Sequence, residues 1–397
     1  MRVTENTLRM SFLSALGQAQ QRIAETQNQV ATGKRVNLPS DDPFAAARIG
    51  ELDASLAKLD QYRANGAFAT SRLGLVEETL VSVVDNLQRV RELAVQGNNA
   101  TLSHADRLAL AAELRERYDG MLALANASDA NGRFLFSGYS ERTQSFTQTA
   151  AGVVYNGDSG QRQLQLSDNR LVAVNDSGSA LFQNIANGNG TFALAVDPSN
   201  SGGLILGRGT VTDTTAFVPD TYDIDFPTPL SYEVRDSGGA LIASGTYADG
   251  ETIAFLGIAI ELDGTPAAGD SLTVTPSTSQ DVFSIVQNLI DALEAPGPGP
   301  GSQALLHSRV GQLITDIDGA VDHVIDARAQ IGARLRTVDE QAALIEGFEF
   351  QLTESLSQLR DLDYAEALSL LSQQLLGLEA AQQTFSRTQN LSLFRFL

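Results

Sequence analysis

The chain has 397 residues, enough for two or three domains, and a formal net charge of −21 at pH 7. Because a chain this acidic repels nucleic acid and anionic lipid, we expect neither nucleic acid nor a membrane as a partner. It has no cysteine, which excludes disulfides, thiolate metal sites and cysteine nucleophiles. No apolar run approaches the roughly 20 residues of a membrane helix, and the opening residues do not have the pattern of a cleavable signal peptide.

The first part of the chain is predicted to be helical, with clear signals at the helix ends. A first helix should end near Gly33, since glycine readily adopts the left-handed conformation that terminates helices. Asp42 followed by Pro43 is a capping pair that predicts the start of a long second helix reaching about residue 96. A bend is expected, if anywhere, at 65–66 (Asn-Gly), and the sequence leaves the continuity of this helix open.

A third helix and then a change of pattern follow. Ser103 with Asp106 predicts a capping box that opens a helix running to about Ala127. Beyond it, an Asn-Gly turn at 131–132 precedes the segment 133–138, which is predicted as a strand. The helical pattern therefore stops near residue 130.

Residues 140–277 contain short alternating runs separated by glycine-rich turns, a pattern typical of antiparallel β structure. This region is acidic, so we expect it to face solvent. Helix returns after Asp281, stops at the Gly/Pro linker 296–301 and resumes over about 302–360. A joint at 361–363 precedes the final helix.

This order predicts a mainly α fold with an inserted β domain. The helices should form a long antiparallel hairpin or bundle, and the insert an antiparallel β-rich outer domain. We divide the chain into a terminal coiled-coil domain (1–41 and 364–397), a helical core (42–139 and 278–363) and an outer domain (140–277).

Both terminal helices carry an apolar stripe that neither can bury on its own, because the apolar residues recur every three and four positions. Chain termini are usually polar, so stripes at both ends indicate helices that dock or polymerise. The candidate assembly residues are Leu8, Phe12, Ile23, Val30, Leu368, Leu371, Leu375, Leu378 and Phe385.

No motif supports catalysis, a metal site or a cofactor. The acidic segment 316–323 has its glycine at the wrong position for a calcium loop, so a solvated helix face explains it better. Asp223 and Asp225 share one face of a strand, as paired glycosidase carboxylates do, but a polar outer face is the simpler interpretation. The three histidines lie apart and lack metal-binding spacing: His104, His307 and His323.

Three stretches together resemble bacterial flagellins and their relatives. Residues 33–47 (GKRVNLPSDDPFAAA) are similar to the family's N-terminal motif, and 86–96 (NLQRVRELAVQ) to the helix that follows it. Residues 364–394 resemble the family's C-terminal pattern. The Asp-Pro pair at 42–43 and the segment 132–138 are more similar to the hook-associated members than to filament flagellins.

The resemblance implies a structural component of the flagellum, at the junction of hook and filament, exported through the flagellar type III pathway to the extracellular flagellum. It implies terminal helices that are disordered in the monomer and fold into coiled coils on assembly. The implied partners are neighbouring copies in a ring, the other hook-associated junction protein, flagellin and a cytoplasmic export chaperone.

Three alternatives remain open. The nearest is a filament-forming flagellin with a reduced outer domain, which would form long filaments when seeded alone. The second is an exported enzyme that uses the β insert, which a catalytic screen of the insert would reveal. The third is a coiled-coil adhesin, and loss of motility with intact hooks would separate the junction role from this and from the enzyme.

Overall fold

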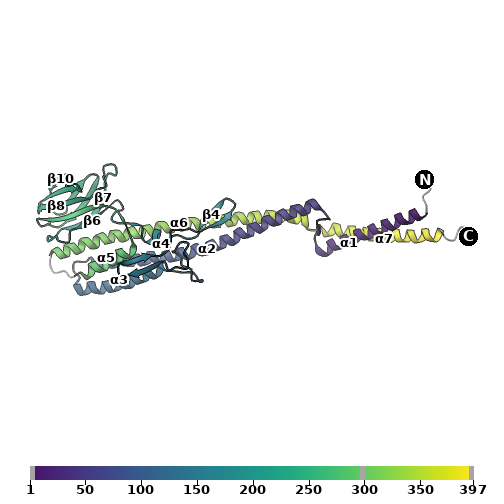
Figure 1. Ribbon diagram of the computed structural model, residues 1–397, viewed down its shortest axis with the longest axis horizontal. Helices are drawn as coiled ribbons and strands as arrows, with labels where there is room; N and C mark the ends of the chain where they lie inside the picture. The colour runs from purple at the N-terminus through teal and green to yellow at the C-terminus, as the bar shows by residue number, and fades with distance from the viewer. Residues whose placement is uncertain (1–4, 296–299, 393–397) are drawn as a thin grey trace. The chain divides into compact units, whose positions relative to one another are not determined.

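The computed structural model describes residues 5–295 and 300–392. They form two compact units, which are described separately. One contains Met1–Asn65 and Glu340–Leu397, and the other contains Gly66–Asp339. The predicted fold class, mainly helical with an inserted antiparallel β region, is confirmed (Figure 1).

The helices follow the predicted signals closely. They are α1 (Glu5–Thr32), α2 (Pro43–Gly97), α3 (His104–Ala125), α4 (Gly178–Phe182), α5 (Val282–Glu294), α6 (Pro300–Arg360) and α7 (Tyr364–Ser392). α2 is assigned as one continuous helix through residues 65–66. The capping box is present, because Ser103 accepts from the Asp106 N–H while the Asp106 carboxylate accepts from the Ser103 N–H. Asp281 caps α5 by accepting from the Ser284 N–H at 2.7 Å.

The predicted strand at 133–138 is wrong. Its backbone groups bond to several unrelated segments instead of to one partner strand. The Phe134 N–H donates to Glu141 O at 2.7 Å, the Leu135 N–H to Ala127 O at 2.9 Å, and the Gly178 N–H to Phe136 O at 2.7 Å. The apolar residues of this segment belong to the core instead, since Phe136 is completely and Leu135 almost completely buried.

All strand pairs among the described residues are antiparallel. The strands of the first part are β1 (Phe146–Thr149), β2 (Gly152–Tyr155), β3 (Gln163–Ser167), β4 (Arg170–Ala173) and β5 (Ile185–Ala186). The later strands are β6 (Phe192–Val196), β7 (Ile205–Val211), β8 (Tyr222–Thr228), β9 (Ser231–Asp236), β10 (Leu241–Thr246), β11 (Thr252–Phe255), β12 (Ile258–Asp263), β13 (Asp270–Pro276) and β14 (Ser279–Gln280).

The strands β6 to β13 build a domain with its own core. A five-stranded sheet has the order β10-β9-β8-β13-β6, and a three-stranded sheet has the order β11-β12-β7. Their apolar side chains form one continuous cluster, which includes Phe226, Ile224, Ile260 and Leu272. Along β8 and β12 these side chains alternate with more exposed ones, as expected for sheets buried on one face.

The earlier strands belong instead to the core of the helices. Phe146 of β1 and Phe182 of α4 are fully buried with 5.5 Å between ring centroids, and Phe146 lies 5.3 Å from Phe283 of α5. The same cluster contains residues of α2, α3 and α6. The packing therefore places the start of the separately packed β domain near residue 187, whereas the sequence placed the outer domain's start at 140.

Two deletions test this division of the core. Removing 190–275 with a short Gly-Ser bridge should leave the helical part folded, because the two ends are already joined by the Asn187 N–H donating to Thr278 O at 3.0 Å. Removing 140–277 should unfold it, since losing Phe146 and Phe182 alone costs about 3–5 kcal/mol each. Thermal unfolding followed by circular dichroism gives the answer. Equal melting temperatures for the two deletions would contradict the division.

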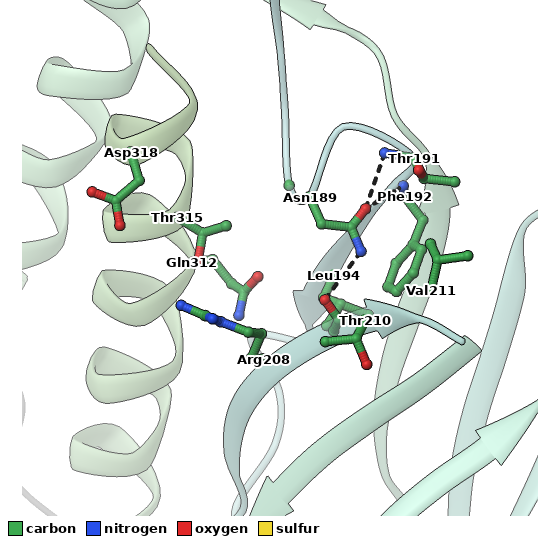
Figure 2. Close-up of a pocket in the computed structure, with 12 residues that line it drawn as sticks. Asn189, Thr191, Phe192, Leu194, Arg208, Thr210, Val211, Gln312, Thr315 and Asp318 are labelled. Carbon is green, nitrogen blue, oxygen red and sulfur yellow. Dashed lines mark hydrogen bonds between the residues drawn. The ribbon is translucent and has the colours of Figure 1, made fainter. Parts of the chain in front are cut away.

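The β domain contacts α6 through the edge strand β7. Ser308 of α6 accepts from the Leu206 N–H at 2.9 Å, and Gln312 donates to Gly207 O at 3.2 Å. Asp316 accepts from the Gly188 N–H at 2.7 Å, and burial raises the pKa of this carboxyl above its ordinary value. Figure 2 shows the cleft beside these contacts, in which Gln312 and neighbouring α6 residues lie opposite β7. The free edge of β7 is thus covered by helix side chains.

A buried tyrosine gives the β domain a predictable response to alkali. Tyr247 is 3% exposed, its hydroxyl donates to Gly264 O at 2.9 Å, and burial raises its pKa to about 12. The folded state therefore holds this proton more tightly than the unfolded state, so its stabilisation is complete below the unfolded pKa near 10 and is lost as pH rises toward 12. Chemical denaturation should show a steeper loss of stability over this range for the natural chain than for Tyr247→Phe. Parallel profiles would contradict the assignment.

Candidate assembly surface

The terminal helices α1 and α7 pack side by side, as Figure 1 shows at one end of the picture. The Phe12 and Phe385 rings stack with centroids 4.4 Å apart, and Thr26 donates to the side-chain oxygen of Gln374 at 3.2 Å. Ile23 is buried between them. Spacings of three and four on both helices produce this seam, as expected for a two-helix coil.

The structure separates the predicted stripe of α7 into two. Leu371, Leu378 and Phe385 are half-buried, whereas Leu368 and Leu375 are 49% and 45% exposed. The predicted single seam is therefore divided. Residues seven apart lie at nearly the same angle around a helix, and residues 368 and 375 lie about 60° around α7 from residues 371 and 378. Ala367 and Gln374 occupy inner positions that the sequence reasoning did not include among the candidate residues.

α1 also has an inner and an outer side. Phe12 and Val30 are half-buried and Ile23 is buried, whereas Met10 and Leu13 are 68% and 46% exposed. Leu8 is a candidate whose side chain lies outside the described residues. The helix pair therefore closes one apolar seam and leaves a second set of apolar side chains uncovered.

The connection between α1 and α2 is hydrogen-bonded to the connection between α6 and α7. The Arg35 N–H donates to Arg360 O at 2.7 Å, and the Leu362 N–H donates to Gly33 O at 3.0 Å. Gly33 has a φ of +70°, which confirms the predicted left-handed stop. A side chain there would meet the Tyr364 hydroxyl, because an ideal Cβ lies 2.7 Å from its oxygen. These hydrogen bonds between the two connections fix the point at which the α1–α7 pair begins.

The start of α2 follows the capping pair. The Ala45 N–H donates to the Asp42 carboxylate at 3.0 Å, which confirms Asp42 as N-cap. This bond is the main reason that the pKa of Asp42 lies below its ordinary value, and Arg35 adds to the effect.

Several of the groups that resembled chemical sites have structural partners. Asp318 pairs with Arg91, and Asp223 accepts from the Thr273 hydroxyl at 3.0 Å. His307 bonds to the Asn98 side chain and His323 to Ala180 O, each at 2.8 Å. In the part of the chain that the structure describes, no three metal-ligating side chains gather. Within those same residues, no helix has the length and hydrophobicity to cross a membrane.

Two family models match the ends of the chain. The bacterial flagellin N-terminal helical region matches residues 3–141, and the bacterial flagellin C-terminal helical region matches residues 314–397. Together they cover the helices that carry the assembly surface and leave the separately packed β domain unmatched.

Individual relatives match this chain in sequence or in structure. Flagellar hook-associated protein 3 of Escherichia coli is 26% identical over 92% of this chain and 90% of its own length. The Salmonella typhimurium protein of the same name is 33% identical over 47% of this chain, and the match spans 58% of that relative. The crystal structure of the flagellar junction protein FlgL from Legionella pneumophila is 33% identical, with a TM-score of 0.69 over 74% of this chain and 99% of that one. The chain belongs to the bacterial flagellin family, among the members typified by hook-associated protein 3.

Proposed function

We propose that this chain is a structural adaptor at the hook–filament junction of the bacterial flagellum. The observation that carries the proposal is the uncovered apolar stripe. Leu368, Leu375, Met10 and Leu13 remain exposed although α1 and α7 already pair with each other. Exposed leucines at helical spacing are costly in a monomer and useful when a neighbouring subunit covers them.

The partners follow from this role. Neighbouring copies in a ring would cover the stripe, the other hook-associated junction protein would lie on the hook side, and flagellin on the filament side. A cytoplasmic export chaperone would keep the terminal helices unassembled until the chain passes through the flagellar type III pathway to the cell exterior. We expect these helices to order on assembly, and we propose no enzymatic activity.

The filament-forming flagellin is the second candidate, and seeding separates the two. The purified chain, mixed with short filament fragments, should stay monomeric or form short rings, because an adaptor must stop after one layer. Electron microscopy and sedimentation measure the outcome. Long filaments built from this chain alone would favour the flagellin role over the junction role.

A further inference from the structure

Arg107, in the first turn of α3, carries a positive charge that is buried. The residue is 8% exposed, and the ion pairs found among the described residues do not include it. Its Nη1 donates to Leu102 O at 3.2 Å, whereas its Nε is buried and makes no hydrogen bond within the described part of the chain. Because a charge taken out of water is costly unless an opposite charge compensates it, an anion beside Arg107 would stabilise the folded state.

The Arg107 side chain lines a cavity of about 100 Å³, where the start of α3 meets the end of α5 and the start of α6. α3 and α5 lie side by side there, as Figure 1 shows. At roughly 30 Å³ for each water molecule, the cavity has room for a small ion but not for a peptide segment. Its size therefore limits the ligand to a few heavy atoms.

A second guanidinium lines the same cavity. It belongs to Arg309 of α6, which is exposed and is also absent from the ion pairs of the described residues. Two cations that share one small cavity repel each other, and the repulsion grows where water is excluded. An anion between them would remove this repulsion.

The acidic residues at the end of α5 do not supply that anion. Glu294 pairs with Arg115, and Asp291 accepts from the Gln287 side chain at 2.8 Å. Asp291 lies with Arg309 in the neighbouring groove, but the two form no ion pair there. None of the described carboxylates lines the cavity itself.

The start of α6 adds backbone donors to the two guanidinium groups. α6 begins at Pro300, so the N–H groups of its first turn have no carbonyl partner within the helix. Ser302 and Gln303 of this turn line the cavity. Helix N-termini attract anions because the unpaired N–H groups and the helix dipole both present positive charge. A buried guanidinium, an exposed one and a helix N-terminus therefore surround the same small space.

We propose that this cavity binds a small tetrahedral oxyanion, such as inorganic phosphate or sulfate, which joins the first turns of α3 and α6. Guanidinium groups bind such anions through charge-assisted hydrogen bonds. A tetrahedral anion has more oxygen atoms than a carboxylate, so it can accept from Arg107, Arg309 and the α6 backbone together. The inference does not rest on the proposed junction function, because no residue of α1 or α7 lines the cavity.

Calorimetric titration of the purified full chain with inorganic phosphate, at neutral pH and constant ionic strength, tests the site. The natural chain should bind one phosphate. Arg309→Gln should weaken the affinity at least about tenfold, because it removes a hydrogen bond from a charged donor. Arg107→Gln should weaken it by at least as much. If the substitution at the buried Arg107 prevents folding, Arg309→Gln still decides, since Arg309 is exposed.

Arg142→Gln is the matched control. Arg142 is exposed and does not line the cavity, so this variant loses the same charge and should bind phosphate as the natural chain does. Phosphate should also raise the melting temperature of the natural chain and of Arg142→Gln by at least about 2 °C more than that of Arg309→Gln. Comparing variants removes the general stabilisation that phosphate gives to folded proteins.

Equal phosphate affinities for Arg309→Gln, Arg142→Gln and the natural chain would overturn the site. So would the absence of binding by the natural chain up to about 10 mM phosphate or sulfate, and the carbonyl groups at the end of α5 would then be what compensates Arg107. Binding of acetate without binding of phosphate or sulfate would also overturn the proposal, because the cavity would then suit a carboxylate.

Discussion

Replacing Leu368 and Leu375 together by aspartate should abolish incorporation into the flagellum while leaving the isolated chain folded. Both side chains are about half exposed on the outer side of the α1–α7 pair, so the new carboxylates would remain hydrated in the monomer. In the assembly a neighbouring helix would cover them, and burying an unpaired carboxylate is prohibitive. Motility in soft agar and immunogold labelling of flagella measure incorporation, and circular dichroism confirms the fold.

Two control variants separate the effect of the outer stripe (Leu368 and Leu375) from that of the inner seam (Leu371 and Leu378). Gln373→Asp with Ala380→Asp adds the same charge at the same spacing of seven on the opposite side of α7, where both residues are exposed. It should incorporate better than the outer-stripe variant. Leu371→Asp with Leu378→Asp should instead disrupt the packing against α1. Normal motility with Leu368→Asp and Leu375→Asp would show that the outer stripe is not an assembly surface.

Replacing Arg72 by methionine should produce the largest loss of stability of any single substitution considered. Arg72 of α2 is 4% exposed, and its guanidinium lies 3.1 Å from the Asp129 carboxylate and 3.4 Å from that of Glu141. It also donates to Phe134 O at 3.0 Å, so it anchors the irregular segment 133–138 to the helix. Burial lowers the pKa of Arg72 although the two carboxylates oppose this shift.

Without the guanidinium, the nearly buried carboxylates of Asp129 and Glu141 keep only Arg133 and Arg162 as ion-pair partners, so we expect a loss at the lower end of the about 3–5 kcal/mol that breaking a buried ion pair costs. Thermal unfolding should show the loss as a melting temperature below that of the natural chain. Arg89→Met, which removes ion pairs of the exposed surface, is the matched control and should change the melting temperature little. A variant at Arg72 as stable as the natural chain would contradict this role of the cluster.

The helices could be predicted from sequence because their signals are local. Gly33, Asp42 and the Ser103–Asp106 pair act on backbone groups within a few residues, so neighbours in the sequence decide the helix ends. The apolar stripes of the terminal helices likewise follow from periodicity alone. These local rules sufficed for six of the predicted elements, including the continuous run of α6 beyond the Gly/Pro linker.

The parts that escaped prediction depend on distant contacts. The segment 133–138 follows a turn dipeptide and is apolar, as a short strand often is, but its backbone partners come from α2, residue 127 and residue 178, which no local pattern indicates. The burial of Arg72 likewise depends on distant residues, because its partners Asp129 and Glu141 lie far along the chain. The division of the α7 stripe required knowing which side α1 occupies, because Leu368 and Leu371 are both apolar and three residues apart.

Electron microscopy of a strain that lacks this protein tests the junction role most directly. Cells should carry hooks without filaments and release flagellin into the medium, since the filament would have no adaptor on which to assemble. Expression of the natural chain should restore filaments, whereas the chain with Leu368→Asp and Leu375→Asp should not. Filaments of normal length on the deletion strain would contradict the account.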